Sequence, residues 1–209
     1  MRLFIIFFFS ALVACGQQSS QTKKHKVDSS ARQLNDSAVA LTQTFFDSLN
    51  YVKAIALLDK ATAIDSDYYI AYWNKIAFQS QIKQYDKALV TSKEMIRLKP
   101  KTPDFYQRTG ILYEIVGDHI SADKYFHNAL ALYDNILDTM KTSNKNYDML
   151  LMSKGVNLIM LGQQQKGNDI LKRLYDTQAD TLYKEMTASF MNKSKTELLD
   201  TYRQNKYSH

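Results

Sequence analysis

The sequence has one cysteine, two prolines and six glycines among its 209 residues. With Cys15 as the only cysteine, the chain can form neither an internal disulfide nor a CxxC metal site. The scarcity of proline and glycine leaves long helices uninterrupted, and 45% hydrophobic residues are enough for a folded core. The composition therefore indicates a folded helical domain with room for a tether.

Charge of one sign is not concentrated over any long stretch. The formal net charge is +6, but Lys and Arg alternate with Asp and Glu along most of the sequence. Nucleic-acid binding requires a basic face, so we expect no nucleic-acid partner. The one dense basic run, residues 23–26, either lies against anionic lipid headgroups or belongs to a soluble linker.

A recognisable catalytic motif is also missing. His119 and His127 are eight residues apart, too far to share a zinc ion in the HExxH manner. SxxK patterns begin at Ser80 and Ser121, but neither has the accompanying motifs of that enzyme class. We therefore expect a protein that is not an enzyme and that uses no metal or cofactor.

The longest apolar run lies at the N-terminus. Residues 3–13 follow a positive Met1-Arg2 pair and are too few to span a bilayer, so they predict a signal peptide. The run ends in Leu-Val-Ala-Cys at residues 12–15, which resembles the lipobox of bacterial lipoproteins. That resemblance implies cleavage after residue 14 and a diacylglycerol on the Cys15 thiol. The alternative is an ordinary signal peptide in which Cys15 is incidental.

The lipobox resemblance also implies a location. Two or more acyl chains anchor a protein stably, so the mature chain is expected to be lipid-anchored and to face the periplasm. Gly16 follows the cysteine, where aspartate favours inner-membrane retention in well-studied Gram-negative lipoproteins, so the outer membrane is favoured over the inner. Residues 15–35 are polar and lack apolar periodicity, which predicts a disordered tether spanning on the order of 25 Å.

One sequence pattern occurs three times at a fixed interval in the middle of the chain. Its copies begin at Asn50, Gln84 and Asp118, each 34 residues after the last. A fixed period of this length predicts an array of helical repeats rather than a compact enzyme fold.

The third copy identifies the type of repeat. Its small and aromatic residues are Tyr106, Gly110, Tyr113, Gly117, Ala122, Phe126 and Ala129. These positions resemble the tetratricopeptide repeat, a helix-turn-helix unit whose helix pairs stack into a right-handed superhelix. The resemblance implies an all-α solenoid of three to four repeats with C-terminal capping helices.

The repeat register divides the chain into segments. Residues 36–134 are expected to hold three repeats, with Asn50 at the turn of the first. Thr102 and Pro103 are expected to open the third repeat, and Gly117 to close its first helix. Residues 135–179 are expected to hold an extended helix, a polar loop and a degenerate fourth repeat. The capping helices are placed in residues 180–209, with a capping box at 194–197.

In the tetratricopeptide family, the first helix of each repeat lines a concave groove that binds protein segments. Carried over by position, the resemblance predicts groove residues in all four repeats of this chain. They are Phe46, Ile70, Trp73, Asn74, Gln81, Gln107, Arg108, Ile111, Glu114, Met152 and Ile159. The family's carboxylate-clamp version needs Lys and Asn in its first repeat, where this chain has Val39 and Gln43, so clamp ligands are disfavoured.

Two main functional interpretations remain open at this point. A third, a degenerate enzyme or regulatory subunit, would be supported only by an activity tied to a specific side chain. In the first, the protein is a membrane-anchored scaffold or adaptor that binds protein or peptide segments of the cell envelope, in envelope assembly. In the second, it is a structural lipoprotein that associates with itself as a homo-oligomer. Its own C-terminal residues 180–203 then cover the groove, and Trp73 belongs to the core.

Overall fold

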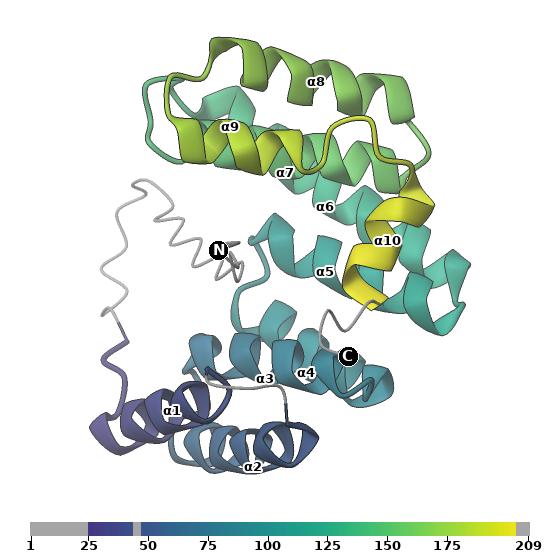
Figure 1. Ribbon diagram of the computed structural model, residues 1–209. Coiled ribbons are helices and arrows are strands. Elements are labelled where there is room, and N and C mark those ends of the chain that lie inside the picture. Colours follow the sequence, from purple (N-terminus) through teal and green to yellow (C-terminus); the bar gives the residue numbers. More distant parts are fainter. Residues whose placement is uncertain (1–24, 44–46, 204–209) are drawn as a thin grey trace.

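The computed structural model describes residues 25–43 and 47–203, which contain ten α-helices and no strand (Figure 1). The predicted all-α class is therefore confirmed for the described residues. The helices are α1 Ser29–Leu41, α2 Ser48–Ile64, α3 Tyr69–Gln81, α4 Tyr85–Leu98, α5 Pro103–Val116, α6 His119–Thr139, α7 Tyr147–Met160, α8 Gln164–Thr177, α9 Thr181–Ala188 and α10 Lys195–Arg203.

The first eight helices form four pairs, α1 with α2 through α7 with α8, and each pair packs on the next. Short turns join the two helices of the second, third and fourth pairs, which therefore run antiparallel. Figure 1 shows the pairs stacked from α1 and α2 at one end to α8 at the other. Because α1 also contacts α3, and α5 contacts α7, the first helices of successive pairs share one side of the array. This shared side is called the inner face below.

Local sequence explains where several helices begin and end. Pro103 is the first residue of α5, where its missing N–H costs nothing, although Thr102 makes no side-chain capping bond. Gly117 ends α5 with a φ of 88°, a left-handed conformation that glycine adopts without strain. The capping box forms as predicted, because Ser194 N–H donates to Glu197 Oε2 over 2.7 Å and Glu197 N–H donates to Ser194 Oγ over 3.2 Å.

Glycines also set how closely paired helices approach. A Cβ added to Gly110 would lie 2.7 Å from the Phe126 ring, so α6 places this ring where α5 has no side chain. In the next pair, a Cβ on Gly167 would lie 2.5 Å from the carbonyl oxygen of Gly155. The backbones of α7 and α8 therefore touch at a point that only glycine permits.

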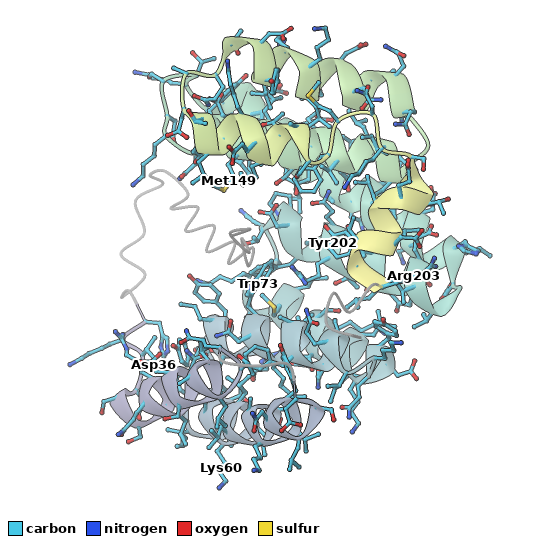
Figure 2. All side chains as sticks on the ribbon, in the orientation of Figure 1. Asp36, Lys60, Trp73, Met149, Tyr202 and Arg203 are labelled. Atoms are coloured by element: carbon cyan, nitrogen blue, oxygen red, sulfur yellow. The ribbon has the colours of Figure 1, made fainter. Side chains whose placement is uncertain are left out.

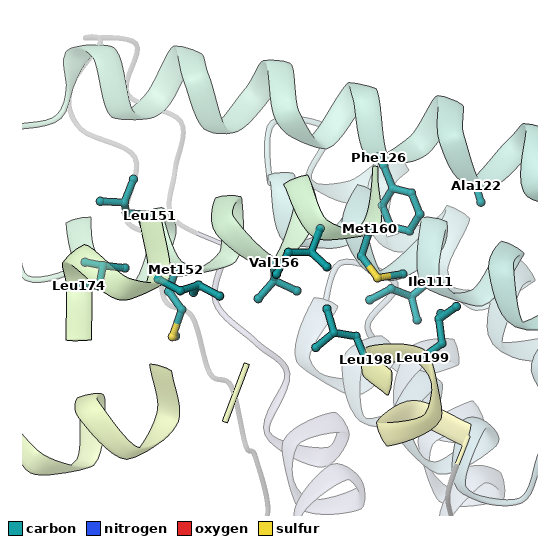
Figure 3. Close-up of a cluster of buried hydrophobic side chains, with 12 residues drawn as sticks. Ile111, Ala122, Phe126, Leu151, Met152, Val156, Met160, Leu174, Leu198 and Leu199 are labelled. Carbon is teal, nitrogen blue, oxygen red and sulfur yellow. The ribbon is translucent and has the colours of Figure 1, made fainter. Parts of the chain in front are cut away.

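The largest hydrophobic cluster joins the last two helix pairs to α10 (Figure 3). Phe126 from α6 and Ile159 from α7 are almost completely buried in it. Leu198 and Leu199 of α10 belong to the same cluster and are 0% and 5% exposed. The C-terminal helix is therefore part of the packed core rather than an appendage.

Two predicted boundaries in the first repeat are wrong. The tether was expected to reach residue 35, but α1 begins at Ser29, where the Asp28 carboxylate accepts two backbone N–H groups. Ala31, at one face of α1, is fully buried, so this turn is held by packing as well as by its cap. Asn50 was expected at a turn but lies inside α2, which begins at Ser48 after the Asp47 cap.

The residues just before α1 form hydrogen bonds with the turn between α2 and α3. The His25 Nε2 atom lies 3.0 Å from Asp65 Oδ2, and the Asp28 N–H donates to the same oxygen over 2.9 Å. The predicted signal peptide and Cys15 lie outside the described residues. Among the helices that the structure does describe, none is long and apolar enough to cross a membrane.

Candidate functional site

A cavity of about 330 Å³ lies on the inner face. It is bordered by α1, α3, α5 and α7, and the side chains of Phe190 and Tyr202 close it from the C-terminal segment. Figure 2 shows Trp73 and Tyr202 facing the space between the first and last repeats. The array and the C-terminal segment thus build this cavity together.

Seven of the eleven predicted groove residues line the cavity. They are Ile70, Trp73, Asn74, Gln107, Arg108, Ile111 and Met152. Gln81, Glu114 and Ile159 lie elsewhere, and Phe46 falls outside the described residues. The repeat register thus brings residues from three different helix pairs to one place.

Arg108 is the cationic residue of the cavity lining, which also includes Asp104. Its Cζ atom lies 4.2 Å from the centre of the Trp73 ring, in stacking distance. Phe105 also packs against Trp73, with the two ring centres 5.8 Å apart. Burial lowers the pKa of Arg108, and the nearby Tyr202 and Asp104 oppose that effect. Arginine keeps its proton in proteins, so the cavity contains a positive charge at all physiological pH values.

Arg108 has no hydrogen bond or ion pair with any other side chain in residues 25–43 and 47–203. The nearest acidic neighbour on α5, Asp104, is already engaged by the Tyr133 hydroxyl, 2.7 Å from Asp104 Oδ1. Burial raises the pKa of Asp104, and the hydrogen bond from Tyr133 opposes this rise. The donor capacity of the guanidinium is therefore left for an external acceptor.

Other polar groups at the cavity already have intramolecular partners. The Asn74 amide donates to Asn35 Oδ1 over 2.8 Å, a bond that ties α3 to α1. The Gln107 amide donates to the Ser153 carbonyl over 3.0 Å and so ties α5 to α7. These two side chains fix the spacing of the inner helices, and they are bound to the protein itself.

Known proteins that resemble this chain were found by sequence and by structure. No protein-family model matches the chain. Over 78 residues, or 37% of its length, the chain is 38% identical to tetratricopeptide repeat protein 28 of Homo sapiens and 36% identical to the Mus musculus protein. The matched segment spans only 3% of the length of these relatives.

The crystal structure of PilW, described as a widely conserved type IV pilus biogenesis factor, superimposes with a TM-score of 0.52. The alignment covers 84% of this chain and 75% of PilW at 18% identity. The chain therefore has the fold of a tetratricopeptide-like solenoid. The alignment with a crystal structure of MamA covers 77% of this chain and 81% of the MamA chain, with a TM-score of 0.48 and 16% identity.

The tetratricopeptide register did not reveal every residue of the cavity. Tyr69, Asp104, Phe105 and Ser153 belong to the inner helices but stand at positions outside the family's groove pattern. Asp104 and Arg108 are four residues apart, a spacing that puts both on one helix face and was available in the sequence. Phe190 and Tyr202 come from a segment without a period, so no repeat register could have placed them.

The part of the tetratricopeptide groove formed by α5 and α7 is covered by the protein itself. Glu114, a predicted groove residue, is 4% exposed. Its carboxylate accepts a hydrogen bond from Lys195 Nζ over 2.6 Å and lies 2.9 Å from His119 Nδ1. Ile159, another predicted groove residue, is fully buried in the cluster that contains α10. At these positions the prediction of an accessible groove is wrong, because Lys195 of α10 covers Glu114 and Ile159 packs against Gly167 of α8.

Metal binding has no support in the described ranges, where no group of three His, Cys, Asp or Glu side chains is placed to hold an ion. The arrangement at the cavity is that of a recognition surface. Aromatic and aliphatic side chains line the cavity together with the Arg108 guanidinium, which has no ion-pair partner among the described residues. The hydrogen-bonded amides of Asn74 and Gln107 link the helices that border it.

Proposed function

We propose that the protein is a membrane-anchored periplasmic adaptor whose inner-face cavity binds a segment of another protein. The observation that carries this proposal is the Arg108 guanidinium, stacked on Trp73 without an ion-pair partner in a cavity of about 330 Å³. A half-buried cation that lacks an internal acceptor is costly unless a ligand or water supplies one.

The chemistry of the walls favours a peptide segment over a small polar metabolite. Val39, Ile70, Phe105 and Val156 give the cavity a mainly apolar lining. Burying one large apolar side chain there contributes about 1.5–3 kcal/mol. A segment that also presents a carbonyl or carboxylate oxygen to Arg108 gains a charge-assisted hydrogen bond.

The location in the cell envelope is the second part of the proposal. Its support is the lipobox-like sequence ending at Cys15, which would anchor the mature protein to a membrane facing the periplasm, with the outer membrane favoured. PilW, whose fold is similar, is described as a type IV pilus biogenesis factor, and a role in envelope assembly for this chain is consistent with that neighbour.

The test is crosslinking in cells followed by mass spectrometry, comparing the unaltered protein with Trp73→Ala and Arg108→Gln. We expect one set of envelope proteins to be lost in both variants, because each removes one half of the stacked pair. Ile120→Ala is the matched control, since Ile120 is 88% exposed on α6, away from the cavity. Circular dichroism confirms that the variants remain folded. Retention of the full set of partners in both folded variants would overturn the proposal.

A second candidate function, self-association, is favoured by a different observation. The apolar side chains of Leu49, Val52 and Ile64 on α2 are 55%, 49% and 51% exposed, at the end of the array that no further repeat covers. Light scattering over a hundredfold range of protein concentration tests it. A mass that stays that of one chain throughout would exclude self-association.

A further inference from the structure

The C-terminal helix α10 occupies the groove in the manner of a bound ligand. Leu198 and Leu199 point from α10 toward Ile111 and Met160 (Figure 3). Both leucines are buried, whereas the preceding residues Thr196 and Glu197 are exposed. The helix therefore presents one apolar edge to the inner face and one polar edge to solvent.

A half-buried ion pair holds the first turn of α10. Lys195 Nζ lies 2.6 Å from Glu114 Oε1, and the side chains are 36% and 4% exposed. The same ammonium lies 6.0 Å from the centre of the Phe126 ring. Glu114 is thus a carboxylate on the groove floor whose basic partner comes from a segment 81 residues away.

The residues that face the groove follow a simple spacing. Lys195, Leu198, Leu199 and Tyr202 stand at positions i, i+3, i+4 and i+7, which is one face of a helix. Tyr202 reaches the cavity that contains Arg108. A single short helix thus connects the acidic groove floor, the apolar cluster and the cavity.

The first turn of α10 is stabilised by residues within the helix itself. The capping box of Ser194 and Glu197 satisfies its first N–H groups locally. It follows Asn192, which has a φ of 60°, and a turn that links it to α9. Among the helices, α10 makes its principal contact with α5.

We propose that α10 occupies the binding site of the partner segment and that the partner binds by displacing α10. The partner segment is then an amphipathic helix with Lys or Arg at its start, an apolar pair three and four residues later, and an aromatic residue at the eighth position. This inference rests on the proposed function and specifies the chemistry of the segment that the groove accepts. The apparent affinity for the partner is the intrinsic affinity multiplied by the fraction of molecules in which α10 is undocked.

The test measures binding of a fluorescein-labelled peptide with the sequence of residues 194–203 to the full-length protein by fluorescence anisotropy. Lys195→Glu in the protein opposes Glu114 with a like charge and releases α10, so the peptide should bind about tenfold more tightly than to the unaltered protein. Lys124→Glu makes the same charge change at an exposed position of α6 and should leave the affinity unchanged. Leu199→Asn provides a second, uncharged means of releasing α10.

Two further measurements make the result decisive. Hydrogen exchange should be faster in α10 of Lys195→Glu and Leu199→Asn, and the added peptide should protect α5 and α7. Peptides carrying Lys195→Glu or Leu198→Asp should not bind. If exchange shows α10 released in either variant and the peptide still fails to bind, the inference is wrong. Unchanged α10 exchange in both folded variants would also overturn it, because α10 would then not be displaceable.

The failure of this inference is distinct from the failure of the proposed function. If the peptide does not bind but crosslinked partners still depend on Trp73 and Arg108, the cavity binds partners of another kind. If the peptide binds but no partner depends on those two residues, the groove has a ligand site and the cavity is not its centre.

Discussion

Single residues decide how closely the helices of the last repeat approach. Gly167 has no room for even one added carbon, because the Gly155 carbonyl oxygen and Ile159 Cγ1 would lie 2.5 Å and 2.6 Å from it. One of these neighbours is backbone and cannot move aside without shifting α7. The close contact between α7 and α8 therefore depends on this one position.

We predict that Gly167→Ala destabilises the protein by about 1–3 kcal/mol, despite the better helix propensity of alanine, because the added methyl forces α7 and α8 apart. Urea denaturation measures the change. Lys166→Ala, next to it on the exposed face of α8, should stay within about 0.5 kcal/mol of the unaltered protein. Equal stability of the two variants would show that the helices adjust without strain.

Asp65 gives a prediction about pH. Burial raises the pKa of this carboxyl, but hydrogen bonds from the Asp28 N–H, His25 and the Asp67 N–H together hold it below its ordinary value. A lowered folded-state pKa stabilises the protein above the unfolded-state value of about 3.9, and this contribution is lost as pH falls through the folded-state pKa.

Asp65→Asn should therefore cost about 1–3 kcal/mol at pH 7 and progressively less below about pH 4. Urea denaturation at both ends of this range provides the measurement. Asp67→Asn, an exposed neighbour on the same turn, is the control and should show little pH-dependent difference. A cost for Asp65→Asn that does not change with pH would mean that the charge of the carboxylate does not matter.

At the scale of the helices, short sequence motifs predicted the features of the fold that depend on residues close together in the sequence. The 34-residue period, Pro103 at the start of α5, Gly117 at its end and the capping box of α10 were all readable from the sequence, and the structure contains them. Each is a property of a few consecutive positions or of a repeated interval. This is why the fold was largely predictable.

The accessibility of the candidate site was not predictable in the same way. Ile111, Glu114 and Ile159 occupy groove positions by register, yet α10 packs on Ile111 and Glu114, and α8 packs on Ile159. That burial depends on contacts between segments far apart in a sequence region without a period. Likewise, the early start of α1 reflects packing of Ala31, which no tether-like composition reveals. Repeat register predicts which residues face inward but not what covers them.

The capping box of α10 supports a prediction at this scale. Ser194→Ala removes the acceptor of the Glu197 N–H and should weaken α10 by about 1 kcal/mol, or roughly fivefold faster amide exchange in that helix. Thr196→Ala, an exposed position inside the box, is the matched control. Exchange rates that are the same in the two variants would mean that packing alone sustains α10.

At the scale of the whole molecule, the sequence before residue 25 makes its own prediction. Cys15→Ser should move the protein from the membrane fraction to the soluble fraction and abolish labelling with a radioactive fatty acid, because the modified thiol is removed. Ser20→Ala, which leaves Cys15 intact, should have no effect. Membrane attachment that persists unchanged in Cys15→Ser would refute the lipoprotein assignment.

The bond between His25 and Asp65 has a mechanical consequence. A force applied through the N-terminal segment enters the array at the turn between α2 and α3, and not first at the start of α1. A partner held at Trp73 and Arg108 is then pulled through α3 and α5, whereas α8 and α9 lie outside this path.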